Sequence, residues 1–166
     1  MSGIFNPGDG GGGGGGVILL KGVQVKRDTA QTISHSTNTN IIFESVDYDP
    51  QGFWSGASPT RLTVPAGMGG LYMAIGSVTY QPDIVEALCN CILLINGSIR
   101  KGISQRTRAG GDATFQTIIQ VVAFLELVAT DYVELRVRHH LVGDTDIGTD
   151  GTWIGAGLSL QPFVPD

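Results

Sequence analysis

The sequence predicts an all-β protein, an antiparallel sandwich or barrel of about eight to ten strands. Short runs rich in valine, isoleucine, leucine and threonine recur along the chain, separated by glycine, proline or asparagine. The dipeptide Asn96-Gly97 lies between two of these runs and is the strongest short-range sign of a β-hairpin. No segment shows a convincing helical pattern of apolar residues.

The first half of the body predicts short strands around one long loop. Residues 17–25 alternate loosely and are rich in valine, isoleucine and leucine. Residues 41–43 are an apolar segment that follows a polar stretch with turn composition. Residues 47–58 contain proline and glycines and predict a loop. Residues 61–64 predict a short strand that ends at Pro65.

Residues 70–80 predict a longer strand with two different faces. Alternation places two sets on opposite faces of this strand, Leu71, Met73 and Ile75 against Tyr72, Ala74 and Gly76. Residues 89–95 and 98–103 predict the two arms of the hairpin. Asparagine and glycine suit its turn because both central residues of a type I′ turn need positive φ.

Three further segments complete the predicted sandwich. Residues 114–128 are apolar and β-branched, which favours a strand over a buried helix. Residues 132–140 alternate between apolar and polar side chains and predict a half-exposed strand. Residues 152–160 predict the last strand.

A run of seven glycines, Gly10 to Gly16, divides the chain into a short head and a globular body. Glycines have no side chain to bury and lose the most backbone entropy on folding, so this run contributes nothing to a core. We expect residues 1–16 to be an N-terminal anchor and tether, and residues 17–166 to be one domain. As a coil the glycines span about 15 Å.

Composition allows a sizeable core and disfavours nucleic acid as a partner. Hydrophobic residues make up 42% of the chain and charged residues 15%. The formal net charge is -5, whereas nucleic acid requires clustered lysine and arginine. Basic residues do cluster around the hairpin, at Arg100, Lys101, Arg106 and Arg108. This pattern is more typical of a solvated sheet edge than of a phosphate site.

We expect no signal peptide, no membrane span and no disulfide. No basic region precedes an apolar run near the start, and no apolar stretch approaches the ~18 residues of a membrane span. This favours synthesis in the cytoplasm. Cys89 and Cys91 lie two apart on one strand and face the same side, so a disulfide between them would be badly strained. We expect two reduced, partly buried thiols rather than a metal pair.

Three segments, in order, resemble the jelly rolls of the C1q and tumour necrosis factor family. Residues 61–72 resemble the family's VP-x-x-G-x-Y segment. Residues 127–135 resemble its L-x-x-G-D-x-V-x-L turn and strand, with Thr130 in place of the usual glycine. Residues 152–158 occupy the place of its aromatic-x-G-x-L terminal strand. Together they cover roughly residues 20–163.

The resemblance implies a jelly-roll sandwich that assembles as a threefold symmetric homotrimer. In that family three strands line the trimer axis. Carried over by motif, the residues of this trimer interface are Tyr72, Ile75, Gln120, Val122 and Trp153. Large amphipathic side chains such as Tyr72 and Trp153 are enriched at interface centres. Both can also belong to the core of one subunit.

The N-terminal part departs from the animal members of that family, which carry a collagen-like stalk. A small jelly roll with a short head and a tether resembles the trimeric virion proteins of bacteriophages, an analogy at the level of the fold. We therefore expect a structural virion protein, a head fibre or capsid decoration protein. Residues 1–16 would join capsid or tail proteins, with a particle anchor at Ile4, Phe5, Asn6 and Pro7.

The alternative is a trimeric receptor- or glycan-binding module of a tail tip or spike. The loop at 47–58 carries Tyr48, Phe53 and Trp54. Exposed loop aromatics stack on sugars or insert into a partner. The same side chains can instead fold back and cap the sandwich.

An enzyme is not predicted. His139 and His140 are adjacent on a strand and face opposite sides, so they cannot serve one site together. The segment 143–151 places Asp144, Asp146 and Asp150 among glycines and resembles the start of a calcium loop. Aspartate and glycine are also the residues of an ordinary solvated turn. Calcium is therefore one of two interpretations, and no other cofactor is expected.

Overall fold

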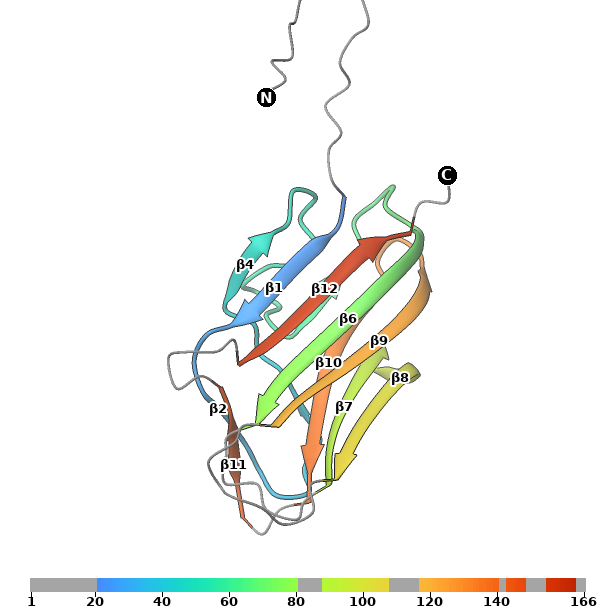
Figure 1. Ribbon diagram of the computed structural model, residues 1–166. Helices are drawn as coiled ribbons and strands as arrows, with labels where there is room; N and C mark the ends of the chain where they lie inside the picture. Colours follow the sequence, from blue (N-terminus) through green and yellow to red (C-terminus); the bar gives the residue numbers. More distant parts are fainter. Residues whose placement is uncertain (1–20, 81–87, 108–116, 141–142, 149–154, 164–166) are drawn as a thin grey trace, which may run out of the picture.

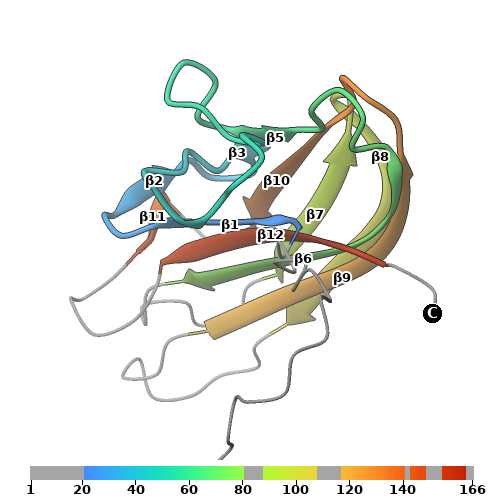
Figure 2. The same cartoon turned by 90° about the horizontal axis from the view of Figure 1, so that it is seen from above.

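The chain forms two antiparallel sheets packed face to face, as Figures 1 and 2 show. The computed structural model describes residues 21–80, 88–107, 117–140, 143–148 and 155–163, with the backbone alone for 99–107. These ranges contain twelve strands and no helix, so the all-β prediction is confirmed and the expected number of strands was too low. Within the same ranges no helix is long and apolar enough to cross a membrane.

The larger sheet, called sheet A, has the strand order β2-β11-β6-β12-β1-β4, and β9 also pairs with β6. Its strands are β1 (Val23–Arg27), β2 (Gln31–Ile33), β4 (Ser45–Tyr48), β6 (Gly70–Tyr80), β9 (Thr117–Leu127), β11 (Thr145–Ile147) and β12 (Ala156–Pro162). The two long strands β6 and β9, in which inward and outward side chains alternate, pair antiparallel over their whole length.

The smaller sheet, called sheet B, has the order β3-β10-β7-β8, and β5 also pairs with β10. Its strands are β3 (Thr39–Asn40), β5 (Arg61–Thr63), β7 (Leu88–Ile95), β8 (Ser98–Thr107) and β10 (Tyr132–His139). The predicted hairpin is confirmed, because Asn96 (φ 52°) and Gly97 (φ 73°) join β7 to β8 with the positive φ values of a type I′ turn.

Several strand predictions differ from the structure, in which β1 ends at Arg27 rather than at residue 25 and β8 at Thr107 rather than at residue 103. Residues 41–43 are not a strand, because Ile41 N–H donates to Leu135 while Phe43 N–H donates to Pro59. The segment thus crosses between the sheets and forms no continuous ladder. At the C-terminal end, β12 continues to Pro162, two residues beyond the predicted end.

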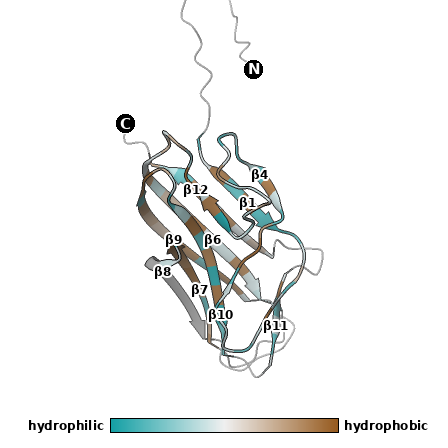
Figure 3. Ribbon diagram, turned by 180° about the vertical axis from the view of Figure 1, so that it is seen from behind, coloured by the Kyte–Doolittle hydropathy of each residue, from teal (hydrophilic) through white to brown (hydrophobic). Residues whose placement is uncertain are grey.

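The core fills the space between the two sheets. Leu135 of β10 packs directly against Gly76 of β6, where a Cβ would lie 2.4 Å from the leucine Cδ1. A glycine at this position therefore sets how closely the sheets approach. Cys89 and Cys91 are both free, and they are buried more deeply in this core than the partly buried thiols that were predicted. In Figure 3 hydrophobic and hydrophilic residues alternate along the strands.

Candidate subunit interface

The face of sheet A that points away from the core carries a band of exposed apolar side chains. On β9 the inward residues are buried, whereas Ile118, Val122 and Phe124 are 47%, 55% and 52% exposed. Leu71 on β6 is 40% exposed, and Phe163, just after β12, is 51% exposed. We call these five residues, together with Met73 and Ile75 of β6, the outer band.

The register of the strands makes the outer band continuous from Val122 to Phe163, whereas Gln120 and Ser77 separate Ile118 from it. Val122 lies opposite Ile75, and Phe124 lies opposite Met73. The rings of Phe124 and Phe163 meet edge to face, with centroids 5.7 Å apart. The band therefore runs from β9 across β6 to the residue that follows β12.

A hollow of about 180 Å³ lies beside the outer band, above β1, β6 and β12. Small side chains make it, because Ser77, Gly157 and Ser159 form much of its floor. Lys26 lies at its side and pairs with Asp47 at 2.9 Å. The same face thus presents a ridge of large apolar residues and a depression beside it.

An apolar outer face is unusual for an antiparallel sheet, which normally has one solvated face with polar residues. Contiguous exposed apolar patches mark sites of protein association. Because the patch is a flat band of aliphatic and aromatic groups on a rigid sheet, it suits a protein surface better than a small polar ligand.

The structure separates the predicted interface residues. Ile75, Gln120 and Val122 belong to the outward face of sheet A, with Gln120 opposite Ser77. The prediction that Tyr72 lines the trimer interface is corrected by the structure. Tyr72 is 2% exposed and belongs to the inward face of β6, so it cannot line a contact between subunits. Its hydroxyl donates to the carbonyl of Met68. Trp153 lies outside the described residues.

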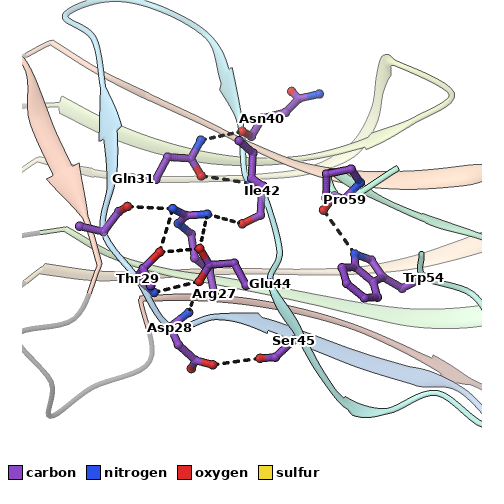
Figure 4. A network of polar contacts seen from close by, with 11 residues as sticks. Arg27, Asp28, Thr29, Gln31, Asn40, Ile42, Glu44, Ser45, Trp54 and Pro59 are labelled. Atoms are coloured by element: carbon purple, nitrogen blue, oxygen red, sulfur yellow. Dashed lines mark hydrogen bonds and ion pairs between the residues drawn. The ribbon is translucent and has the colours of Figure 1, made fainter. Parts of the chain in front are cut away.

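The predicted ligand-binding loop folds back onto the sandwich. Phe53 is 2% exposed and meets Tyr72 edge to face at 6.0 Å, so the expectation that it binds a ligand is wrong. Trp54 packs against the core, and its indole N–H points toward the carbonyl of Pro59 (Figure 4). The cause is local, because the Asp49 carboxylate accepts the backbone N–H groups of both aromatics, at 2.8 and 2.9 Å. Tyr48 ends β4 and is half-buried.

An ion pair between the buried Arg27 and the exposed Glu44 holds the segment that crosses between the sheets. Arg27 is 8% exposed and contacts Glu44 at 3.1 Å (Figure 4). It also donates to the carbonyls of Ala30 and Ile42, each at 2.8 Å. These contacts fasten β1 to the chain before β4, so the cluster has a structural role.

Two of the candidate calcium residues, Asp144 and Asp146, join the β11 segment to the β2 segment. Asp144 accepts the backbone N–H of His35 at 3.1 Å, and Asp146 accepts the hydroxyl of Thr32 at 2.7 Å. Among the described residues no group of three or more histidine, cysteine, aspartate or glutamate side chains could hold a metal ion. Asp150 and the predicted anchor, residues 4–7, lie outside the described ranges.

Sequence reasoning missed Phe124, Phe163 and Leu71 as exposed residues. A signal was present in residues 118–124, where both alternating sets are apolar apart from Gln120. A strand with two apolar faces is buried on both sides. In β9 one face lies in the core, and the other carries the exposed side chains of Ile118, Val122 and Phe124.

Comparison with solved structures identifies the fold. The globular domain of zebrafish complement 1qA protein matches with a TM-score of 0.57 at 11% identity, over 88% of this chain and 99% of that chain. Murine APRIL matches with a TM-score of 0.61 at 9% identity, over 86% and 98%. Eiger TNF from S. frugiperda matches with a TM-score of 0.55 at 15% identity, over 89% and 94%. No protein-family model and no curated protein matches the sequence.

The chain therefore has the jelly-roll fold of the C1q and tumour necrosis factor domains, as its motifs predicted. At these identities the likeness establishes the fold alone.

Proposed function

We propose that this protein is a homotrimeric, non-enzymatic jelly-roll module of a bacteriophage particle, a head fibre or capsid decoration protein. The observation that carries the trimer is the outer band, since a second subunit is the partner that every copy of the chain has available. The ridge and the hollow are different surfaces of one face. Their pairing between copies is heterologous, and such contacts form a ring such as a trimer when the rotation from one copy to the next closes.

The N-terminal segment supplies the particle attachment in this proposal. Residues 1–16 precede the body as a short head followed by seven glycines. Such a tether reaches about 15 Å as a coil, enough to join a threefold module to a lattice of different symmetry. The partners are capsid or tail proteins, and the location is the virion.

The receptor- or glycan-binding alternative loses its original support, because Phe53 is buried and Trp54 packs against the core. A ligand at the outer end of the particle would need another surface. The opposite sheet offers one.

The first test is the mass of the full-length protein by light scattering after size exclusion. We expect three times the chain mass of 17.5 kDa, maintained on dilution to micromolar concentration. A monomer at all concentrations would overturn the trimer. The second test compares the whole chain with a variant lacking residues 1–16 for incorporation into particles. Retained incorporation without these residues would overturn the anchor.

A further inference from the structure

Three arginines share the face of sheet B that points away from the core. On β10 the residues Val133, Leu135 and Val137 are fully buried, so Arg136 and Arg138 belong to the opposite face. On β5 the buried residue is Leu62, which places Arg61 on that same face. All three arginines are half-buried. We call them the arginine face.

Within the part of the chain that the structure describes, these three guanidinium groups make no ion pair. Arg61 lies over the ring of Tyr132 at 4.8 Å and donates to the hydroxyl of Ser58 at 3.2 Å. Arg136 donates to the side-chain oxygen of Asn40 at 2.8 Å. The Nε of Arg138 has no hydrogen-bond partner. Ion pairs within the described ranges instead involve Lys26 and Arg27, on the other sheet.

The acidic residue beside the arginine face, Glu134, already has a hydrogen-bond partner. Glu134 lies opposite Arg61 in the register of β5 and β10, but the residue is 8% exposed and its carboxylate accepts a hydrogen bond from the side-chain amide of Asn40 at 2.8 Å. The chain therefore leaves an excess of positive charge on this surface, although its formal net charge is -5. Such a local excess attracts an anionic partner.

The arginines lie on a rigid apolar floor. Ile92 and Leu94 belong to the outward face of β7, and they are 7% and 0% exposed. Arg136 is directly opposite Ile92 across the two strands. Arginine stems cover apolar surface, and the Nε atoms of Arg61 and Arg138 are buried together with their stems. A guanidinium placed in this way loses little further freedom on binding, which favours affinity.

We propose that the arginine face binds an anionic polysaccharide through its carboxylate or sulfate groups. Arg136 and Arg138 are two residues apart on one strand, so their Cα atoms are separated by about 7 Å. Each planar guanidinium can bind one carboxylate or sulfate through two parallel hydrogen bonds. Two cations on β10 with a third on the neighbouring β5 suit a polymer with repeated negative charges.

The surface fits a polysaccharide better than a nucleic acid or an acidic peptide. Single-stranded nucleic acid needs open aromatic rings for base stacking, and Arg61 already covers the ring of Tyr132. A peptide that adds to a sheet needs an unpaired strand edge. Strand β10 pairs with β7 on one side and with β3 and β5 on the other.

This inference does not rest on the trimer. The arginine face belongs to sheet B and the outer band to sheet A, and the two sheets cover opposite sides of the core. Both surfaces can therefore be occupied together, and loss of one activity leaves the other measurable. A trimer would present three arginine faces and bind a long polymer more tightly than one subunit does.

The test measures binding of the full-length protein to three immobilised polymers at low salt: heparin, which carries sulfate, alginate, which carries carboxylate, and neutral dextran. We expect binding to heparin or alginate and none to dextran, with affinity falling as salt rises. Binding to heparin but not to alginate would show that the ligand carries sulfate groups. Binding to both polymers would show that the site accepts any polyanionic sugar. Equal binding to dextran, or binding to none of the three, would overturn the proposal.

Variants locate the binding. Arg138→Gln should weaken binding about tenfold, the effect of one lost charge-assisted contact. Arg138→Lys should retain part of the binding affinity, because the positive charge stays while the paired N–H donors of the guanidinium are lost. Lys21→Gln removes one positive charge from an exposed residue before β1 and is the matched control. Equal binding by Arg138→Gln and Lys21→Gln, or tighter binding to single-stranded DNA than to heparin and alginate, would overturn the proposal.

Discussion

Val122 of β9 lies directly opposite Ile75 of β6, and the two side chains form the middle of the outer band. The neighbours Val121 and Ala123 are 3% and 9% exposed, whereas Val122 is 55% exposed. A slip of one residue between the strands would exchange these faces and bring Val122 into the core. The core thus fixes the register, and the register fixes which apolar residues a partner meets.

The first prediction is that Val122→Asp dissociates the trimer. An aspartate at the centre of the outer band would be buried against the neighbouring subunit without a partner, which is costly. The subunit itself should stay folded, because the residue is half-exposed in the monomer. Light scattering should give the mass of one chain, with the circular dichroism of the wild type.

Ile42→Asp is the control for this experiment. Ile42 is 41% exposed and lies in the segment that crosses between the sheets, away from the outer band. We expect its mass to equal that of the wild type. Wild-type mass for Val122→Asp as well would show that subunits associate elsewhere.

The second prediction concerns Tyr72, which belongs to the core. Tyr72→Phe removes the hydroxyl that donates to Met68 and should lower the free energy of unfolding by about 1 kcal/mol. Tyr72→Ala should cost about 3–5 kcal/mol, as truncation of a buried aromatic does. Denaturant unfolding of the Val122→Asp background measures both without interference from association. Tyr72→Phe made without the Val122 substitution, with wild-type stability but altered mass, would return Tyr72 to the interface.

Alternation explains both the success and the error of the sequence prediction on β6. The period of two correctly assigned Leu71, Met73 and Ile75 to one face and Tyr72 to the other. It could not say which face is inside, because both contain apolar residues. That choice depends on contacts distant in sequence, above all Leu135 against Gly76.

The aromatic loop shows a second limit. Composition alone does not distinguish Phe53 and Trp54 exposed to a ligand from the same residues folded back. The deciding group is Asp49, whose carboxylate accepts two backbone N–H groups four and five residues later. This local signal is present in the sequence. The arginine face, by contrast, needs the pairing of β5 with β10, which no local pattern contains.

The third prediction is that Thr130→Gly stabilises the protein. Thr130 has φ 76°, in the left-handed region where a β-branched residue is strained. It occupies the position where similar jelly rolls have glycine. We expect the free energy of unfolding to rise by about 0.5–1 kcal/mol. This is the difference between the backbone strain that is relieved and the conformational freedom that glycine adds to the unfolded chain. The melting temperature should rise by about 1–4 °C.

The neighbouring substitution Ala129→Gly serves as the comparison. Ala129 has no positive φ, so glycine there brings only the entropic cost and should destabilise by about 0.5–1 kcal/mol. Destabilisation by both glycines would mean that contacts of the Thr130 side chain outweigh its backbone strain.

The fourth prediction is a loss of stability at alkaline pH caused by the two core thiols. Burial raises the pKa of Cys89 to about 11 and the pKa of Cys91 to about 12, against about 8.5 in an unfolded chain. Between these values the unfolded state releases a proton that the folded state keeps. The contribution to stability is therefore complete below about pH 8.5 and is lost as the pH rises toward 11 and 12.

The free energy of unfolding should accordingly fall across this interval, by up to about 1.4 kcal/mol per pH unit for each thiol. Cys91→Ala removes one titrating group, so its stability should fall less steeply with pH, whatever its stability at neutral pH. Thiol reagent at pH 8 should modify the unfolded chain at once and the folded protein slowly, because the thiolate is the reactive form. Equal pH slopes for the variant and the wild type, or immediate modification of the folded protein, would show that the core does not hold these thiols protonated.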